Sequence, residues 1–496
     1  PANGLIYAPP HPCACYIRSK LKGFNALAPR TEERAAAAGE GDAPRLRKGP
    51  AYGDSGGEAA EPGDWPTYRR DTERSGRAGC TVPTDLRRAW TSAFGETPTA
   101  PVIAGGRVYV ATPGNYRVHC LDAETGRRMW SYTAGGRVDS PPTIHRGKVL
   151  FGCADGRVYC LRASDGSLAW TFRAAPGKRR IVDFNRLESS WPVHGTVLVQ
   201  DGVAYFAAGR CSYLDDGIYL YGLDAQSGEK LFRTQVYSRN PETGQEPQDR
   251  VHGVSMPGAL PDILSSDGSS IFMRHRRFSP EGEELDQDVR HIYCSAGFLD
   301  DTWWHRTYWQ YGTRMDTGYG GWPNEGNRRI SGRILVRDGD DFYGYGRKEY
   351  GHHGAHIGVD GKHYRLFAAR LSEDGHTYRW EKRIPFWARG MVLAGDTLFA
   401  AGPPVPPYLH GDGKRRRMSR GNWYGTHYFT ASQPREAMKA WRGKKGSRLW
   451  AISTGDGRKL ESMRLDSNPI FDGLAAADGA LYLSTENGEV ICFRGQ

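Results

Sequence analysis

The stretch of the chain that is richest in side chains suited to ligand chemistry begins at Phe298, reaches Gly312 and continues to Pro323. Indole rings stack on sugar rings or planar ligands, and nearby acidic and imidazole groups hydrogen-bond to polar edges. The candidate ligand contacts of this stretch are Asp300, Asp301, Trp303, Trp304, His305, Trp309 and Trp322. The alternative is that these aromatic side chains pack an irregular loop onto the rest of the protein.

A second candidate loop lies within residues 403–446 and contains Trp423, Tyr424 and His427. The proline-rich start of this stretch, at residues 403–407, favours a rigid extended backbone. The three side chains are candidate ligand contacts at the same mouth as the tryptophan-rich stretch. A ligand loop and a packing loop both remain open at this point.

Three histidines form the best candidate for a metal site. His352, His353 and His356 lie close together, and imidazole is a ligand for zinc, copper or iron. No carboxylate or cysteine stands at a recognised spacing from them, so further ligands would have to come from elsewhere in the chain. The alternative is a polar loop without metal.

Several classes of function find no support in the sequence. No phosphate-binding glycine motif follows a predicted strand, and no nucleophile elbow surrounds a serine in a strand–turn–helix context. No stretch approaches 18 consecutive apolar residues, so we expect no membrane-spanning helix. The net charge is +11, and the densest basic run, residues 414–417, fits either an acidic glycan or a solvated loop. Ordered aromatic interleaving is absent from the basic runs, so we expect no nucleic-acid partner.

A repeat of about 40 residues organises the chain. The segments that end at Trp130 and Trp170 align without a gap, with a leucine, a glycine and the tryptophan each 40 residues apart. Each segment follows a short apolar strand, at residues 105–111 and 146–152. The unit therefore reads as strand, tight turn, strand, glycine-containing turn and a strand that ends on an aromatic residue.

Seven such units follow Thr97 if two degenerate copies, at residues 267–296 and 338–380, are included. One four-stranded unit cannot bury both of its faces, and a period of this length is typical of propeller blades, which pack radially. The sequence predicts an all-β propeller of four-stranded blades with long inserted loops. We expect the aromatic residue that ends a unit to fill the wedge between neighbouring blades. Cysteines that recur at one strand position, such as Cys120, Cys160 and Cys492, are expected to be buried apolar residues.

The chain divides into three predicted segments. Residues 1–29 resemble the end of a blade, residues 30–63 read as a linker or flexible loop, and residues 64–496 form the propeller. The ring has seven blades, or eight if residues 1–29 join it. The segment 86–94 reads as an outer strand that completes the final blade and closes the ring. Because the chain opens at Pro1, we expect a processed product or part of a longer protein, with a preceding propeller domain possible.

The repeats resemble those of the pyrroloquinoline-quinone-type (PQQ-like) β-propellers, on the residues of Gly105–Ala111 and Val118–Trp130 and their copies. The start at Asp64–Asp71 is similar to the entry of such propellers in large bacterial proteins. These propellers form the quinoprotein dehydrogenase-like superfamily, which includes a non-catalytic lipoprotein of outer-membrane-protein assembly. The resemblance covers 97–237 well, 388–496 moderately and 258–385 poorly.

The resemblance implies a test for catalysis. The family's enzymes hold the quinone between a tryptophan and a disulfide of adjacent cysteines, beside a calcium ion, but this chain has no adjacent cysteines. We therefore expect a non-catalytic scaffold or binding protein without a cofactor, whose inserted loops bind a protein or glycan partner at one face of the ring. The alternative is a PQQ-dependent dehydrogenase of alcohols or sugars that uses PQQ and calcium. The resemblance also implies a periplasmic or extracellular location.

Overall fold

The protein was analysed as a computed structural model, which describes most of the chain. The described residues are 2–8, 24–29, 44–54, 56–183, 185–238, 243, 259, 261–294, 297–299, 309–313, 328–348, 364–373, 375–406 and 433–496.

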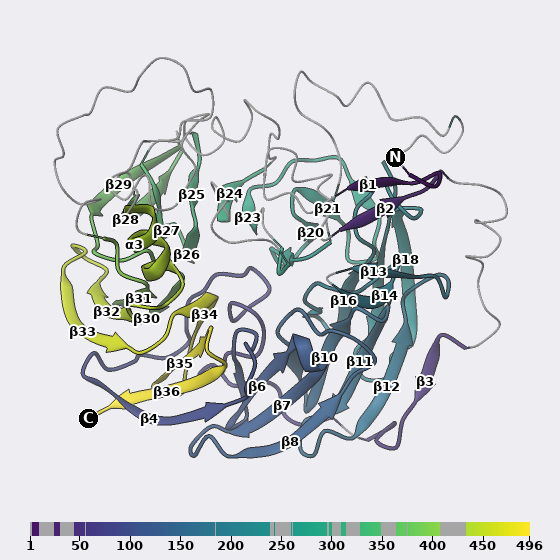
Figure 1. The fold of residues 1–496 in the computed structure, drawn as a ribbon, viewed down its shortest axis with the longest axis horizontal. Helices are drawn as coiled ribbons and strands as arrows, with labels where there is room; N and C mark the ends of the chain where they lie inside the picture. The colour runs from purple at the N-terminus through teal and green to yellow at the C-terminus, as the bar shows by residue number, and fades with distance from the viewer. Residues whose placement is uncertain are drawn as a thin grey trace.

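Eight antiparallel sheets are arranged around a ring, which confirms the predicted propeller (Figure 1). Blade 1 comprises β5 (Val102–Ala104), β6 (Arg107–Thr112), β7 (Arg117–Asp122) and β8 (Arg128–Thr133). Blade 2 comprises β9 (Thr143–His145), β10 (Lys148–Cys153), β11 (Arg157–Arg162) and β12 (Leu168–Arg173). Blade 3 comprises β15 (Leu198–Gln200), β16 (Val203–Ala208), β17 (Ile218–Asp224) and β18 (Lys230–Val236). Blade 4 comprises β19 (Leu264–Ser266), β20 (Ile271–Met273), β21 (Arg276–Phe278) and β22 (Glu284–Leu285).

The second half of the ring is less regular. Blade 5 has three strands, β23 (His291–Cys294), β24 (Trp309–Gly312) and β25 (Ile330–Gly332). Blade 6 comprises β26 (Ile334–Asp338), β27 (Asp341–Arg347), β28 (Tyr364–Ser372) and β29 (Gly375–Lys382). Blade 7 comprises β30 (Gly390–Ala394), β31 (Thr397–Gly402), β32 (Ser447–Ser453) and β33 (Lys459–Leu465). Blade 8 comprises β34 (Pro469–Ala477), β35 (Ala480–Thr485), β36 (Glu489–Gly495) and β4 (Leu86–Ala93).

The remaining elements lie outside the eight four- or three-stranded repeats. They are β1 (Ile6–Ala8), β2 (Asn25–Leu27), β3 (Leu46–Lys48), β13 (Arg180–Asp183), β14 (Arg186–Ser189), the 3-10 turn η1 (Pro113–Asn115) and α3 (Gln433–Trp441). Strand β3 lies within the predicted linker 30–63 and adds a fifth strand to blade 2 by pairing with β12. No helix of the described residues is long and apolar enough to cross a membrane.

The eighth blade has a different origin from the one considered in the sequence. Strands β1 and β2 pair with each other and not with a blade, so residues 1–29 do not supply it. It arises because residues 267–296 belong to two blades: β19–β22 form blade 4, and β23 opens blade 5. Strand β24 of blade 5 is part of the tryptophan-rich stretch. Residues 309–312 of this stretch therefore form a blade strand and not part of an irregular loop.

The ring closes by strand pairing between the two ends of the propeller, as predicted. Strand β4 pairs with β36, and Trp90 stands opposite Cys492. Because the last blade borrows its outer strand from the start of the propeller, opening the ring costs a full ladder of backbone hydrogen bonds. Cys120, Cys160 and Cys492 are all fully buried, which confirms their predicted place in the core.

Tryptophans at the ends of four repeat units dock onto the next blade, which confirms the predicted wedge. Trp130 Nε1 donates a hydrogen bond to the carbonyl oxygen of Ala163 at 3.0 Å, and its ring lies against Gly166 in the next blade. Gly166 has φ +75°, and a Cβ there would lie 2.6 Å from the Trp130 ring. Both the backbone conformation and the lack of space therefore require glycine at this position. The same indole-to-carbonyl bond joins Trp90 to Ala123, Trp170 to Gln226 and Trp380 to Thr454.

The ring has two faces, which we name by the innermost strand of each blade. The upper face is where these strands begin, and the lower face is where they end. Antiparallel alternation places the ends of β18, β27 and β31 on the upper face. The described strand ends next to residues 239, 349 and 407 therefore all lie there, and α3 lies on the same face, over blade 7.

Candidate functional site

Residues 64–78, the axial segment, lie across the lower end of the ring axis. The segment forms backbone hydrogen bonds with the innermost strands of five blades, at Ile103, Ile144, Ser266, Arg337 and Leu393. Side chains of Tyr68, Arg69 and Arg74 then reach blades 3, 5, 6 and 8, as described next. The segment therefore joins all eight blades at the hub, and its position explains why blades with little repeat signal still belong to one ring.

Asp472, in the innermost strand β34 of blade 8, is the centre of a buried cluster at the axis. Its carboxylate pairs with Arg69 Nη1 at 2.8 Å and accepts hydrogen bonds from Trp309 Nε1 at 2.8 Å and Tyr68 Oη at 3.1 Å. The Arg69 guanidinium also lies 4.1 Å from the centre of the Trp309 ring. Burial outweighs these donors and raises the pKa of Asp472, and burial also raises the pKa of Tyr68.

Arg74 fills the axis beside this cluster. Its side chain is 0% exposed and donates to the carbonyl oxygen of Leu264 at 2.9 Å and to that of Tyr68 at 2.8 Å. A further bond of 3.3 Å reaches Thr196 Oγ1, so this one guanidinium links blades 3 and 4 to the axial segment. Burial lowers the pKa of Arg74 to about 10, which still leaves it charged near neutral pH. The cluster can hold blades together, but it offers no solvent-exposed acid, base or nucleophile.

A second group of charges, the upper charge cluster, is buried on the upper face between blades 1 and 3. It consists of Arg137, Asp139, Glu188 and His194. Arg137 contacts Asp139 and Glu188, each at 3.1 Å. His194 Nδ1 lies 2.7 Å from Asp139 Oδ2, and His194 Nε2 lies 3.7 Å from Glu188 Oε1.

Ionic partners set the protonation of this cluster. Burial opposes a charge on His194, but its hydrogen bond to Asp139 and the nearby Glu188 carboxylate outweigh it and raise the pKa of His194 to about 9. Burial likewise opposes a charge on Asp139, and its bond to His194 lowers the pKa of Asp139 below its usual value. The cluster therefore places two basic side chains against two acidic ones. The cluster ties the loops that precede blades 2 and 3 to strand β14.

Most of the ligand contacts predicted from the sequence lie outside the described residues. These are Asp300, Asp301, Trp303, Trp304, His305, Trp322, Trp423, Tyr424 and His427. Trp309 is described: it lies in β24, it is 0% exposed, and its indole belongs to the axial cluster with Asp472. A ligand role for the other residues stays a prediction.

The predicted metal ligands, His352, His353 and His356, also lie outside the described residues. In the described part of the chain, no group of three histidine, cysteine or acidic side chains is arranged so that it could hold a metal ion. The metal site stays a prediction.

A quinone stacked on a tryptophan needs an open indole face, and the buried tryptophans at the axis and upper face do not offer one. The guanidinium of Arg69 covers Trp309, and that of Arg179 lies 5.0 Å from the centre of the Trp191 ring. Every cysteine in the described part of the chain is a free thiol. These residues do not fit the arrangement of PQQ that the resemblance implies, and the expectation that no cofactor binds stays a prediction.

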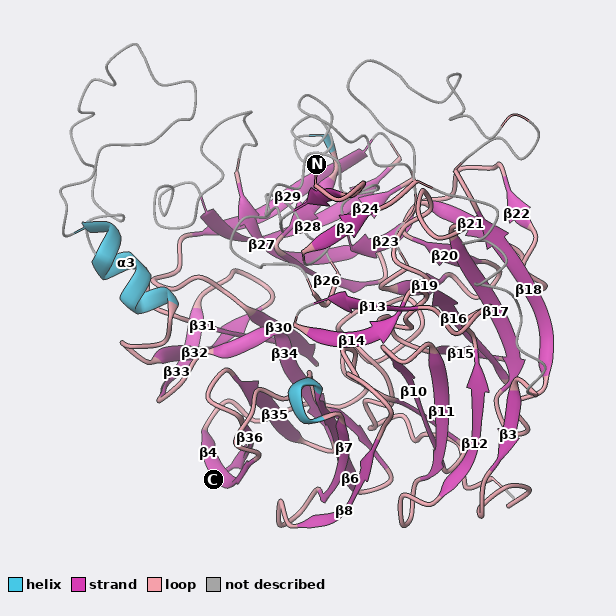
Figure 2. Cartoon of the chain, turned by 45° about the vertical axis from the view of Figure 1, so that its right-hand side comes forward, coloured by secondary structure: helices cyan, strands magenta, loops and turns pink. Residues whose placement is uncertain are grey.

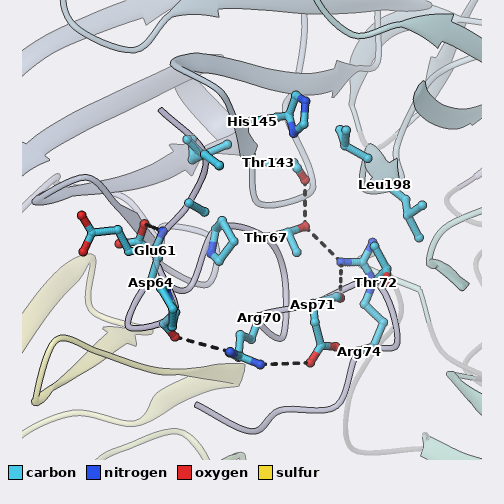
Figure 3. A pocket seen from close by; sticks show the side chains of 16 residues that line it. Glu61, Asp64, Thr67, Arg70, Asp71, Thr72, Arg74, Thr143, His145 and Leu198 are labelled. Carbon is cyan, nitrogen blue, oxygen red and sulfur yellow. Dashed lines mark hydrogen bonds and ion pairs between the residues drawn. The ribbon is translucent and has the colours of Figure 1, made fainter. Parts of the chain in front are cut away.

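A pocket of about 540 Å³ opens on the lower face, between residues 59–74 and the innermost strands of blades 2 and 3 (Figure 3). Figure 3 shows Arg70, Asp64 and Asp71 along one side and His145 and Leu198 on the other. Asp64 is already bonded to the backbone of Glu61 at 2.8 Å, so part of its charge is satisfied within the chain. The volume suits a small molecule, but its mixed lining does not select one class of ligand.

Sequence reasoning missed the axial cluster. Its members come from three separate parts of the chain, residues 68–74, Trp309 and Asp472, and they do not recur at the blade period. No pattern in the sequence therefore marks them as neighbours.

Comparisons with known proteins agree with this architecture. The family model described as outer membrane protein assembly factor BamB matches residues 74–259. No curated protein sequence matches the chain. Solved structures with a similar fold include the quinohemoprotein alcohol dehydrogenase of Comamonas testosteroni, with 15% identity, a TM-score of 0.52, and coverage of 88% of this chain and 82% of that chain.

Two further structures are similar to about the same extent. Quinohemoprotein alcohol dehydrogenase ADHIIG of Pseudomonas putida HK5 has 13% identity, a TM-score of 0.51, and coverage of 88% and 80% of the two chains. A europium-containing methanol dehydrogenase has 12% identity, a TM-score of 0.51, and coverage of 88% and 98%. At these identities the likeness concerns the fold and not the activity. The repeats, the closed ring of blades and the family match over residues 74–259 together show that this chain has the fold of the PQQ-like β-propellers.

Proposed function

We propose that the protein is a non-catalytic propeller scaffold that binds a protein or glycan partner through its inserted loops at one face of the ring. The observation that carries this proposal is the filled axis. Tyr68, Arg69, Arg74, Trp309 and Asp472 are all buried there and are bonded to one another or to neighbouring blades. A ligand along the axis would have to displace a buried ion pair, which is costly.

Two further observations support a partner at the inserted loops. Strand ends flank insertions on the upper face next to residues 239, 349 and 407, and on the lower face at Cys294 and Trp309, and sites carried by loops on rigid scaffolds commonly serve recognition. The family model that matches residues 74–259 is named for an outer-membrane-protein assembly factor. A periplasmic or extracellular location is part of the proposal. The alternative is a dehydrogenase that uses PQQ and calcium to oxidise alcohols or sugars, and it is favoured by the likeness to quinohemoprotein alcohol dehydrogenases.

The first experiment separates the two functions. Purified protein is mixed with pyrroloquinoline quinone and calcium, and its absorbance spectrum and dye-linked oxidation of alcohols and sugars are measured. We expect neither a bound-quinone spectrum nor dye reduction. Substrate-dependent dye reduction that requires both additions would overturn the scaffold function.

A second experiment tests the glycan partner. Wild-type protein and the variants Trp303→Ala and Trp304→Ala are applied to a glycan array, with Tyr378→Ala as the control because Tyr378 is an exposed aromatic residue on the outer strand of blade 6. We expect binding that both tryptophan variants lose and the control keeps. Equal binding by all four proteins would remove the tryptophan-rich stretch from the glycan site.

A further inference from the structure

The hairpin of β13 and β14 exposes apolar side chains on the upper face. Val182 and Leu187 stand directly opposite each other in the register, so both project from the same side of the hairpin. Their side chains are 68% and 58% exposed, respectively. Exposure of two large apolar residues at one place has an unfavourable hydration free energy, so their pairing here requires an explanation.

The same alternation separates the charges of the hairpin. Asp183 and Glu188 face the ring and are 2% exposed, and Glu188 is held there by Arg137. Lys178 and Arg180 are exposed, and Arg180 shares a side with Val182 because the two are two residues apart on one strand. The outward side of this hairpin therefore combines apolar and basic groups, while its carboxylates are turned inward.

The hairpin of β1 and β2 extends this surface. Ile6, Tyr7 and Phe24 are 61%, 42% and 55% exposed. The adjacent Ile6 and Tyr7 project from opposite sides of this hairpin, and the Tyr7 and Phe24 rings lie 6.1 Å apart. In both overall views β2 lies close to β13 and β14 (Figures 1 and 2).

Polar contacts tie the two hairpins together. Asn25 in β2 accepts a hydrogen bond from Arg210 at 2.7 Å, and Arg210 pairs with Asp215 at 2.6 Å. Asp215 also pairs with Arg179, next to β13. The two hairpins are therefore joined through blade 3. We call their exposed residues Ile6, Tyr7, Phe24, Lys178, Arg180, Val182 and Leu187 the hairpin surface.

Other exposed large apolar side chains of the described residues do not cluster in this way. Met129, Leu231 and Tyr378 lie on the outer strands of three different blades. Single exposed apolar residues are ordinary on soluble proteins and need no partner. The hairpin surface differs because five apolar residues on two linked hairpins share the upper face with basic side chains.

We propose that the hairpin surface docks onto an anionic lipid surface. Projecting apolar side chains beside lysine and arginine suit the boundary between headgroups and acyl chains, where the apolar groups insert and the cations meet phosphate. A net charge of +11 adds long-range attraction to an anionic surface. The inference does not depend on the proposed function, because a scaffold and an enzyme with these hairpins would dock alike.

Vesicle binding tests the inference. Purified protein is floated with vesicles of phosphatidylglycerol and phosphatidylcholine, and separately with vesicles of phosphatidylcholine alone. We expect binding to the anionic vesicles that weakens as sodium chloride is raised. The double variant Val182→Asp/Leu187→Asp should bind at least about 10-fold more weakly, because it removes the inserting groups and adds repulsion.

Matched variants make the outcome specific. Leu231→Asp changes an equally exposed leucine, 56% against 58%, on a blade rim and should leave vesicle binding unchanged within about twofold. Lys178→Glu/Arg180→Glu should abolish the preference for anionic vesicles while circular dichroism and the thermal midpoint stay those of the wild type. Equal vesicle binding by Val182→Asp/Leu187→Asp and wild type would overturn the inference. Wild-type self-association or glycan binding that depends on Val182 and Leu187, without vesicle binding, would also overturn it.

Discussion

The regular and irregular parts of the ring are held together at different radii. Between blades 1, 2 and 3, the junctions are made at the rim, where Trp130 and Trp170 dock onto the next blade. Blade 4 ends in a two-residue strand, and blade 5 has only three strands. There the contact is made at the hub, where Trp309 of blade 5 meets Asp472 of blade 8 and Arg69 of the axial segment.

This difference shows that one architecture can be closed by two kinds of chemistry. Rim junctions bury large apolar rings and add one hydrogen bond each, so they are insensitive to charge. The hub uses a buried ion pair, which is specific but has a high desolvation cost. A blade that has lost the repeat pattern can therefore stay in the ring if the axial segment forms contacts with it.

The largest expected effect comes from removing a rim tryptophan. Trp170→Ala empties a fully buried site and leaves the carbonyl oxygen of Gln226 without its donor, so we expect a loss of about 5 kcal/mol in stability. Phe232, which occupies the same place at the junction of blades 3 and 4, is only half-buried. Phe232→Ala should cost about 2 kcal/mol. Urea unfolding midpoints measure the stability loss of both variants. Equal losses would contradict the expectation that the more deeply buried ring contributes more stability.

Breaking the hub should cost slightly less. Arg69→Met leaves Asp472 buried without its cation, and we expect a loss of about 4 kcal/mol. Adding Asp472→Leu should recover at least half of this loss, because no buried charge then remains unpaired. Unfolding midpoints of both single variants and the double variant form the cycle. An additive double variant would show that Arg69 and Asp472 do not act as a pair.

The upper charge cluster makes one junction sensitive to pH. The folded-state pKa of His194 is about 9, above the ordinary value of 6.5, so its contribution is fully present below pH 6.5. The contribution is lost as pH rises from 6.5 to 9, by about 3 kcal/mol. Unfolding midpoints across this range should fall for wild type and stay nearly flat for His194→Gln. Parallel pH profiles would exclude a charged His194.

The smallest effect separates backbone strain from docking. Gly166 and Gly105 both have positive φ, +75° and +58°, but only Gly166 lies against a tryptophan ring. Gly105→Ala should cost about 1 kcal/mol from backbone strain alone. Gly166→Ala should cost about 2 kcal/mol more, because its methyl group displaces Trp130. Thermal unfolding of the two variants measures the difference in stability. An equal loss of stability would mean that the indole ring of Trp130 moves away from the new methyl group without cost.

The repeat predicted most of the fold because blade formation is local. Two strands and a glycine turn lie within one 40-residue unit. The match between the Trp130 and Trp170 segments therefore predicted the strands and turns of one blade. Outer-strand exchange was also predictable, because the segment 86–94 supplies a strand that the last unit lacks. Blade 5 was not predictable, because β23, β24 and β25 are separated by long insertions and keep no shared motif.

The candidate site could be predicted only in part. Aromatic and histidine clusters are visible as composition, yet composition does not reveal whether a ring faces solvent or the core. Trp309 illustrates this: it has the same residue type as its neighbours in the tryptophan-rich stretch, but its indole is buried against Asp472, more than 160 residues away. The hairpin surface could not be predicted either, because the exposure of Val182 and Leu187 depends on which other segments pack against the hairpin in the folded protein.

By itself the sequence determined the blades, their tryptophan junctions and the strand that closes the ring, because each depends on periodicity or on a complementary missing strand. Only the tertiary structure decided the number of blades, the filling of the axis and the arrangement of buried charges. These features join residues that are far apart in the sequence, such as Arg69 with Asp472 and Arg74 with Thr196. Such contacts form only when the blades assemble around the axis, so no local pattern in the sequence predicts them.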